Sequence, residues 1–186
     1  MPDRIANVVI LAEDDEQANL VRHFLKQVGQ RVKRVETASA SGGSGEKFVR
    51  DNFAREVHAC RSSLGRRASA LLVAIIDADN ETTQKRRQQL DDMLKKAGKD
   101  TLNDDEPVVM LIPKRNVETW VCALLGKKVD ENTDYGKGRA SKSTSQQIQP
   151  AAERLFEITR PHADIPEDFP QSLKDSIPEW KKIPKS

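Results

Sequence analysis

Residues 71–81 read Leu-Leu-Val-Ala-Ile-Ile-Asp-Ala-Asp-Asn-Glu, an apolar run that ends in three acids at alternate positions. An unbroken apolar run that is rich in branched side chains is typical of a strand buried on both faces, as in a parallel sheet covered by helices. Ligands of such folds bind just beyond the carboxyl ends of the strands. The sequence therefore places Asp77, Asp79 and Glu81 where a functional site is expected.

A second short apolar run, residues 8–12, also stops at a cluster of acids that begins with Glu13. If strands 8–12 and 71–76 lie side by side in a parallel sheet, Glu13 converges with Asp77 and Asp79 at one edge. Close carboxylates repel one another unless a cation or a proton relieves them. Hard oxygen ligands suit Mg²⁺, which keeps several waters and bridges to phosphate. The two strand ends together predict a site for Mg²⁺ (or Mn²⁺).

The acids after residue 76 have a second interpretation, as the start of the next helix. Acids near a helix N-terminus are favoured by the helix macrodipole, and Asn80 is a good N-cap. On this segment alone the two interpretations are about even. The second acidic strand end at Glu13 favours the metal site.

Strand and helix patterns alternate up to residue 126, an order that predicts an α/β fold with a parallel four-stranded sheet covered by helices. Gly29, Gly98 and Gly126 are expected to end helices, and Asn116 is expected to begin one. A short irregular C-terminal extension follows. The expected organisation is an α/β domain at 1–126, a flexible basic loop at 127–149, and a C-terminal helix with a proline-rich tail at 150–186.

Composition limits the functional classes. Charged residues make up 32% of the 186 residues, yet the net charge is only +2, so any nucleic-acid-binding surface must be local. Aromatic residues are 4%, which argues against a stacking platform for single strands. Cys60 and Cys122 form no ligand-spaced motif and are expected to pack as small hydrophobes in a reducing cytosol. No signal peptide or membrane span is recognised, so we expect a cytoplasmic protein without a membrane partner.

Cations follow the fourth predicted strand, on the same edge as the acids. Lys114 and Arg115 could hold a phosphodiester against a metal, which makes both nucleic-acid-binding candidates and Lys114 a catalytic candidate. Glu118, in the first turn of the next helix, is a ligand, a base or an acid that complements the helix dipole. Lys137 and Arg139 of the basic loop are further candidate contacts to a phosphate backbone.

The glycine-serine segment 39–46 opens a helix, yet it lacks the Lys-Ser/Thr of a P-loop and the spacing of a dinucleotide fingerprint. A flexible connection is the better interpretation.

Glu13 and the stretch Asp77-Ala-Asp-Asn-Glu81 resemble the motifs of the TOPRIM domain, the topoisomerase–primase fold. This fold also occurs in small nucleases and in OLD-type nucleases associated with phage defence. The family pattern is a Glu that ends the first strand and an Asp-x-Asp, in some members Asp-x-Asp-x-Glu, that ends the third. The resemblance covers about residues 5–125, and residues 112–120 also look like a stretch of small standalone TOPRIM-like proteins of defence loci.

The resemblance implies a TOPRIM/Rossmann-like fold and Mg²⁺-dependent hydrolysis of phosphodiester bonds in DNA or RNA. Glu13 would be the acid/base or a ligand, and Asp77, Asp79 and Glu81 would hold metal. A larger ATPase or another defence-system subunit is the implied protein partner. The family's Glu is usually followed by Gly, whereas Asp14 follows Glu13 here; a side chain at that position would crowd a substrate or add a ligand.

Two alternatives remain open. The acids that begin at Glu13 also resemble the start of a response-regulator receiver domain, in which Asp77 would be the phosphoacceptor. A receiver should have a fifth strand ending in Lys, which is not recognised after residue 126, and Ile112 stands where Thr or Ser is expected. The second alternative is a non-catalytic TOPRIM-like interaction subunit, whose acidic edge binds a metal or a basic partner without turnover.

Overall fold

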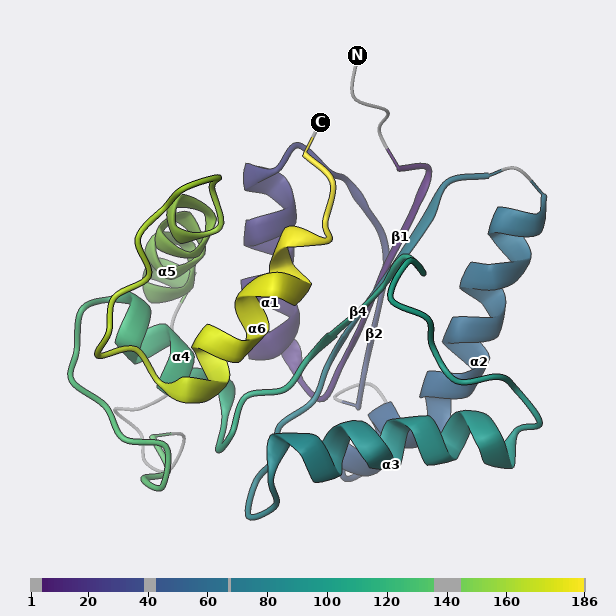
Figure 1. Cartoon of the computed structure of the whole chain (residues 1–186), viewed down its shortest axis with the longest axis horizontal. Coiled ribbons are helices and arrows are strands. Elements are labelled where there is room, and N and C mark those ends of the chain that lie inside the picture. The colour runs from purple at the N-terminus through teal and green to yellow at the C-terminus, as the bar shows by residue number, and fades with distance from the viewer. Residues whose placement is uncertain (1–4, 39–42, 67, 136–144, 186) are drawn as a thin grey trace.

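The computed structural model describes residues 5–38, 43–66, 68–135 and 145–185, and it shows an α/β fold built on one parallel sheet (Figure 1). The strands lie in the order β2-β1-β3-β4, so the two central strands are β1 and β3. Their register sets Ala12 opposite Ile75. The predicted four-stranded parallel sheet is therefore confirmed. The bounds are β1 Asn7–Ala12, β2 Val32–Thr37, β3 Ala70–Ile75 and β4 Val108–Leu111.

Helices cover both faces of this sheet, because alternate side chains of the buried strands point to opposite sides. Leu71, Val73 and Ile75 of β3 belong to one apolar cluster, and Leu72 and Ala74 belong to the other. The first cluster lies under α1, α4, α5 and α6, and the second lies under α2 and α3 (Figure 1). The bounds are α1 Asp15–Gln27, α2 Gly45–Gly65, α3 Thr83–Lys96, α4 Val117–Leu124, α5 Ser145–Ile158 and α6 Gln171–Lys181.

The helix boundaries follow the local signals. Gly29, Gly98 and Gly126 all adopt positive φ just beyond the ends of α1, α3 and α4, as predicted. Asn116 caps α4 by accepting a hydrogen bond from the Thr119 amide at 3.2 Å. These positions need a residue that tolerates the left-handed region or a side chain that satisfies a free amide.

The expected cap Asn80 does not start α3. The N-cap is Thr82, whose hydroxyl accepts from the Lys85 amide at 3.0 Å, and the first turn of α3 contains no acid. The interpretation of the acids in 77–81 as a helix start is therefore wrong. They lie in the loop that connects β3 to α3.

The segment expected to be an irregular extension contains two helices that complete the core. α5 begins at Ser145, earlier than expected, and α6 occupies the stretch interpreted as a proline-rich tail. Trp180 of α6 is buried against Phe24, with 4.6 Å between the ring centroids. Leu173, Ile177 and Trp180 follow helical spacing and are all buried. Their burial outweighs the cost of a proline at position 178 inside the helix.

The segment between α4 and α5 is partly described. Glu131 and Asp134 tie it to the core, because the Glu131 carboxylate accepts from the Ser172 amide at 2.9 Å and Asp134 accepts from the Asn116 amide group at 2.7 Å. Lys137 and Arg139 lie outside the described residues.

The two cysteines are free thiols. Cys60 is buried in α2, where burial raises its pKa to about 11, and Cys122 lies half-buried in α4. The expectation that Cys60 packs as a small hydrophobe is confirmed.

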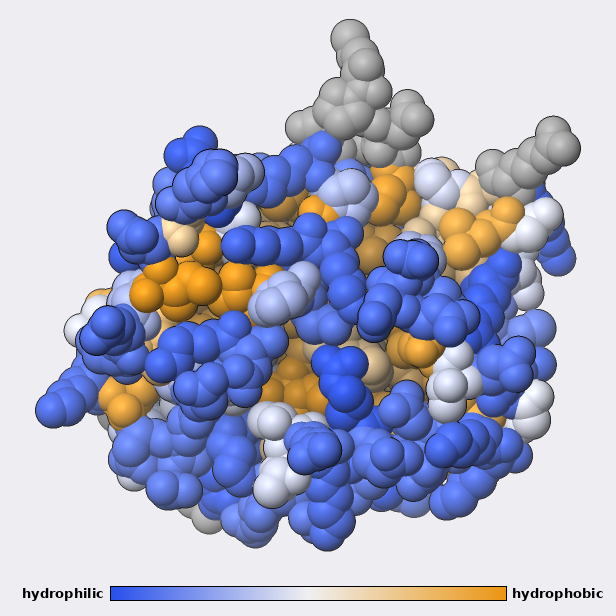
Figure 2. Space-filling view, viewed as in Figure 1, coloured by the Kyte–Doolittle hydropathy of each residue, from blue (hydrophilic) through white to orange (hydrophobic). Residues whose placement is uncertain are grey.

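The visible surface is largely hydrophilic, as the high fraction of charged residues requires (Figure 2). Hydrophobic surface shows in the hollow between α6 and α3, where Met110 and Ile112 line a pocket of about 270 Å³ (Figure 2). Among the helices of the described ranges, none combines the length and the apolar character that crossing a bilayer demands.

Candidate functional site

The carboxyl ends of β1 and β3 lie at the lower edge of the sheet in Figure 1, and the residues that follow them there include Glu13 and Asp77, which lie in contact. The amide N–H of Asp77 donates a hydrogen bond to Glu13 Oε1 at 2.7 Å. The chain runs from β1 to β2 on one side of β1, and then crosses back to β3 on the other side of β1. The carboxyl ends of β1 and β3 are therefore the topological switch point of the sheet. Ligands of open parallel sheets bind at such a point. The convergence predicted for these two residues is found.

Glu13 is held from three sides. Its amide donates to the Gln17 side-chain oxygen at 3.0 Å, and its carbonyl accepts from the Ala38 amide at 3.3 Å. Burial raises the pKa of the Glu13 carboxyl to about 7, against the opposing effect of the hydrogen bond from Asp77, and the charges of Asp79 and Asp14 raise it further. A carboxyl in this state can carry a proton near neutral pH.

Gly45 allows α2 to begin directly against Glu13. A Cβ at Gly45 would lie 2.7 Å from the Glu13 Cβ, closer than a Cβ approaches another atom, and a tight 3.1 Å from Oε2. Gly43, two residues earlier, has nothing within 4 Å of the same position. The glycine-serine segment was interpreted as a flexible connection, and one of its glycines proves to be a contact of the site.

Asp77 carries a shielded carboxylate oxygen. Its Oδ1 is cut off from solvent and has no hydrogen-bond partner among the described residues. Burial raises its pKa well above the ordinary value, and the charges of Glu13 and Glu118 add to the shift. An orphaned carboxylate oxygen of this kind is satisfied by a proton or by a cation.

Glu118 belongs to the same cluster. It lies in the first turn of α4, where the helix dipole favours an acid, yet it is 9% exposed, and its charge acts on Asp77. The dipole role and the role in the acidic site therefore apply together.

Asp14 acts on the site through its charge and through the start of α1. Its carboxylate caps α1 by accepting from the Gln17 amide at 2.9 Å, and its charge raises the pKa of Glu13.

Asp79 extends the site toward a buried cation. It adopts a φ of 54°, in the left-handed region, and its carboxylate lies 3.5 Å from the Arg86 guanidinium. Arg86 is only 4% exposed and also forms an ion pair with Glu46 of α2. Burial raises the pKa of Asp79, and the charge of Arg86 lowers it. Arg86 thus partly neutralises the acidic edge.

Sequence reasoning missed both Arg86 and Glu46, although Arg86 carried a signal. It stands four residues before Leu90 and eight before Leu94, on the buried stripe of α3. A charged residue on such a stripe is a candidate for a buried ion pair.

Glu81, Lys114 and Arg115 form the rim of the loop. The Glu81 carboxylate pairs with Lys85 at 2.7 Å, and the hydrogen bond from Lys85 lowers its pKa. Lys114 donates to the backbone carbonyl of Glu81, and Arg115 donates to the Asn80 side chain. These cations therefore hold the acidic loop in place from the direction of β4.

The donor set fits Mg²⁺ better than it fits a metal with a complete protein cage. Within the four described ranges, no three His, Cys, Asp or Glu side chains are arranged to hold a metal ion. Mg²⁺ is usually bound through one or two carboxylates, with waters and substrate phosphates as the other ligands. Glu13 and Asp77, with the unpartnered Oδ1 of Asp77, provide such a pair.

Neither a family model nor a curated protein nor a solved structure matches this chain. The fold and the site define its class, an α/β protein with a carboxylate cluster at the switch point of a parallel sheet.

Proposed function

We propose that this chain is a Mg²⁺-dependent nuclease with a TOPRIM-like site, which hydrolyses phosphodiester bonds of nucleic acid. The observation that carries the proposal is the convergence of Glu13 and Asp77 at the switch point, with an Asp77 oxygen that has no hydrogen-bond partner in the described part of the chain. Asp79 and Glu118 add carboxylates to the same edge. Such a concentration of negative charge is stabilised by a divalent cation, and a cation there attracts phosphate.

Glu13 and Asp77 would hold the ion, with Asp79 beside them, and the ion would supply charge neutralisation and activation of water when bound. Glu13 is the proposed acid/base, since a carboxyl with a pKa of about 7 can accept a proton and return it near neutral pH. Gly45 keeps the space beside its carboxylate open at the N-terminus of α2.

The surrounding cations would position the substrate. Lys114 and Arg115 stand at the end of β4 and support the 77–81 loop, while Arg86 lies buried beneath Asp79. Without them the carboxylates would repel a polyanion. Lys114 is the proposed phosphate contact among them, because its ammonium lies at the rim rather than in the core.

A cleavage assay tests the proposal. Purified protein with Mg²⁺ or Mn²⁺ should nick plasmid DNA or degrade RNA, and chelation of the metal should stop the reaction. Glu13→Gln and Asp77→Asn should each abolish cleavage, whereas Glu153→Gln, an exposed acid on α5, should cleave like the wild type. Equal activity in Glu13→Gln and Glu153→Gln would refute the assignment.

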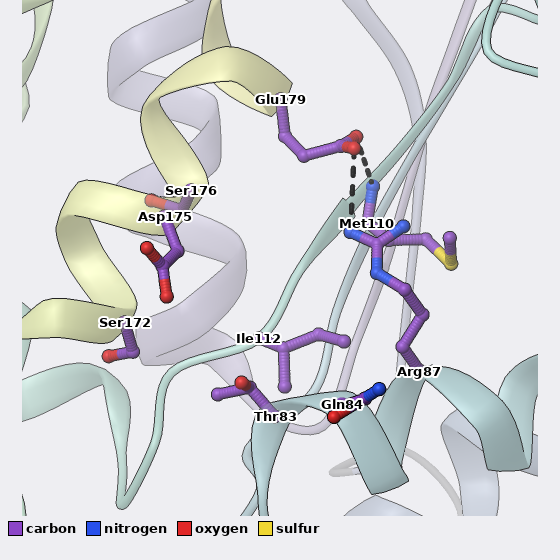
Figure 3. A pocket seen from close by; sticks show the side chains of 9 residues that line it. All are labelled: Thr83, Gln84, Arg87, Met110, Ile112, Ser172, Asp175, Ser176 and Glu179. Carbon is purple, nitrogen blue, oxygen red and sulfur yellow. Dashed lines mark hydrogen bonds and ion pairs between the residues drawn. The ribbon is translucent and has the colours of Figure 1, made fainter.

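The receiver alternative draws support from the strand order, because β2-β1-β3-β4 matches the first four strands of a flavodoxin-like sheet. Against it, α6 lies along the outer edge of β4, where a fifth strand would pair. The Glu179 carboxylate of α6 accepts from the Met110 amide at 3.2 Å and pairs with Arg87 (Figure 3). The nuclease is therefore the better-supported function.

A phosphorylation assay separates these functions. Intact-mass detection of a phosphoryl group on Asp77 after treatment with acetyl phosphate, without nuclease activity, would favour the receiver. Inactivity in both assays would favour the interaction subunit, with a larger ATPase or defence-system protein as its partner.

A further inference from the structure

A second charged feature lies on the opposite side of Glu13 from β3, along the edge strand β2. A shallow groove of about 470 Å³ runs between β2 and α1. Among the described residues, no acid and no aromatic side chain lines it. The lining side chains are Arg22, Lys26, Gln30, Arg31, Val32, Lys33, Arg34 and Val35.

Most of this positive charge is uncompensated. Within the described residues Arg22, Lys26 and Arg31 form no ion pair, and all three are exposed. Lys33 donates to the neutral side chain of Asn7 at 2.6 Å, and only Arg34 is engaged by carboxylates, those of Glu36 and Glu56.

The positive charge of the groove comes from one segment of a chain that is nearly neutral as a whole. The whole chain has 31 Lys and Arg against 29 Asp and Glu, whereas residues 17–35 include five Lys and Arg and no acid. A local excess of this kind is the electrostatic footprint of a polyanion-binding surface.

Protection of the edge strand β2 against pairing with another sheet explains only some of the groove cations. Charged side chains on an edge strand prevent pairing with another sheet, which explains Lys33 and Arg34. Arg22 and Lys26 stand on α1 and have no part in that role. They face the same groove as the strand cations.

The groove lies along the strand that ends beside the carboxylate site. β2 runs parallel to β1, and at its end the Ala38 amide donates to the Glu13 carbonyl. A strand advances about 3.3 Å per residue, so the last groove residue, Val35, lies about 10 Å along the chain before Ala38.

We propose that the groove between α1 and β2 binds the sugar-phosphate backbone of a nucleic-acid duplex and directs it toward the carboxylate site. This inference rests on the proposed nuclease function and extends it to the class of substrate. The lack of aromatic residues in the groove disfavours a single strand held by base stacking. An anionic membrane fits less well, because binding in its interface requires exposed apolar anchors, and Leu64 is the only large hydrophobic residue exposed among the described residues.

A matched pair of triple variants tests the inference. Arg22→Gln/Lys26→Gln/Arg31→Gln removes three groove cations, and Lys95→Gln/Lys96→Gln/Lys99→Gln removes three at the end of α3. Binding of a short labelled duplex is measured by fluorescence anisotropy over a salt series, with Ca²⁺ in place of Mg²⁺ to prevent cleavage. The groove variant should bind at least tenfold more weakly, and its salt slope should fall by about one for each lost phosphate contact. The control variant should match the wild type.

Three results would overturn the inference: unchanged binding by the groove variant, equal loss in both variants, or groove-dependent binding of phosphatidylserine vesicles with no binding of duplex. The same duplex titration with the Asp77→Asn/Asp79→Asn variant separates the groove inference from the catalytic proposal, because the groove cations remain in place when the carboxylates are removed. Groove-dependent duplex binding by a protein that never cleaves would refute catalysis and leave the groove assignment standing. Cleavage that is insensitive to the groove variant would refute the groove alone.

Discussion

The amide of Asp77 donates to the Glu13 carboxylate at 2.7 Å, and this hydrogen bond joins the ends of the two central strands. It also sets two carboxyl groups side by side where burial raises the pKa of both. At neutral pH the pair therefore carries an electrostatic repulsion that a proton or a cation relieves. Stability, metal binding and activity should all respond to that repulsion.

The first prediction concerns pH. Because the pKa of Glu13 is raised from 4.5 to about 7, the folded state binds this proton more tightly than the unfolded state. The resulting stabilisation is present at low pH and is lost as the pH rises from about 4.5 to about 7. Glu13→Gln should remove most of this loss, which amounts to about 3 kcal/mol in the free energy of unfolding. Urea unfolding at pH 5 and pH 8 measures it, with Glu153→Gln as the control. A wild-type pH dependence in Glu13→Gln would contradict the prediction.

The second prediction concerns metal. Mg²⁺ that binds the folded state alone should raise the melting temperature, by an amount equivalent to about 2.7 kcal/mol at one hundred times the dissociation constant. Asp77→Asn/Asp79→Asn should lose this increase and keep the fold. Asp51→Asn, which removes an exposed acid of α2, serves as the control. An equal metal-induced increase in the double variant would rule out this site.

The third prediction uses two neighbouring glycines. Gly45→Ala should shift the Glu13 side chain, because the new Cβ would lie 2.7 Å from the Glu13 Cβ. Cleavage and the Mg²⁺-induced increase in melting temperature should both fall. Gly43→Ala should have no effect on either, since nothing lies within 4 Å of its Cβ position. Equal behaviour of the two alanine variants would show that the contact with Glu13 is unimportant.

The fourth prediction concerns the buried cation. Arg86→Gln removes the buried partner of Glu46, which keeps its pair with Arg50, and a neighbour of Asp79, so the free energy of unfolding should fall by about 2 kcal/mol. Lys85→Gln breaks only the exposed pair with Glu81 and should cost less than about 1 kcal/mol.

A double-mutant cycle checks the assignment of that loss. If the ion pair is responsible, Glu46→Gln/Arg86→Gln should be more stable than the sum of the two single changes predicts. Strict additivity would mean that Arg86 acts through packing rather than through its pairing with Glu46.

The sequence by itself determined the central strands, their shared parallel direction and the position of the acids. An apolar run such as 71–76 has one stable environment, between two helical layers, and its carboxyl end then leaves Asp77 at the edge of the sheet. The start of α4 at Asn116 and its end at Gly126 could also be predicted from the sequence, because capping depends on local backbone geometry.

Tertiary structure alone decided which further groups reach those acids. Gly45 meets Glu13, Glu118 acts on Asp77, and Arg86 lies under Asp79 only because α2, α4 and α3 pack against the sheet at particular positions. The same holds for α6, whose buried Trp180 offsets an internal proline that made the segment resemble a tail. Periodicity records which face of an element is apolar, whereas contacts between distant elements depend on how those faces pack together.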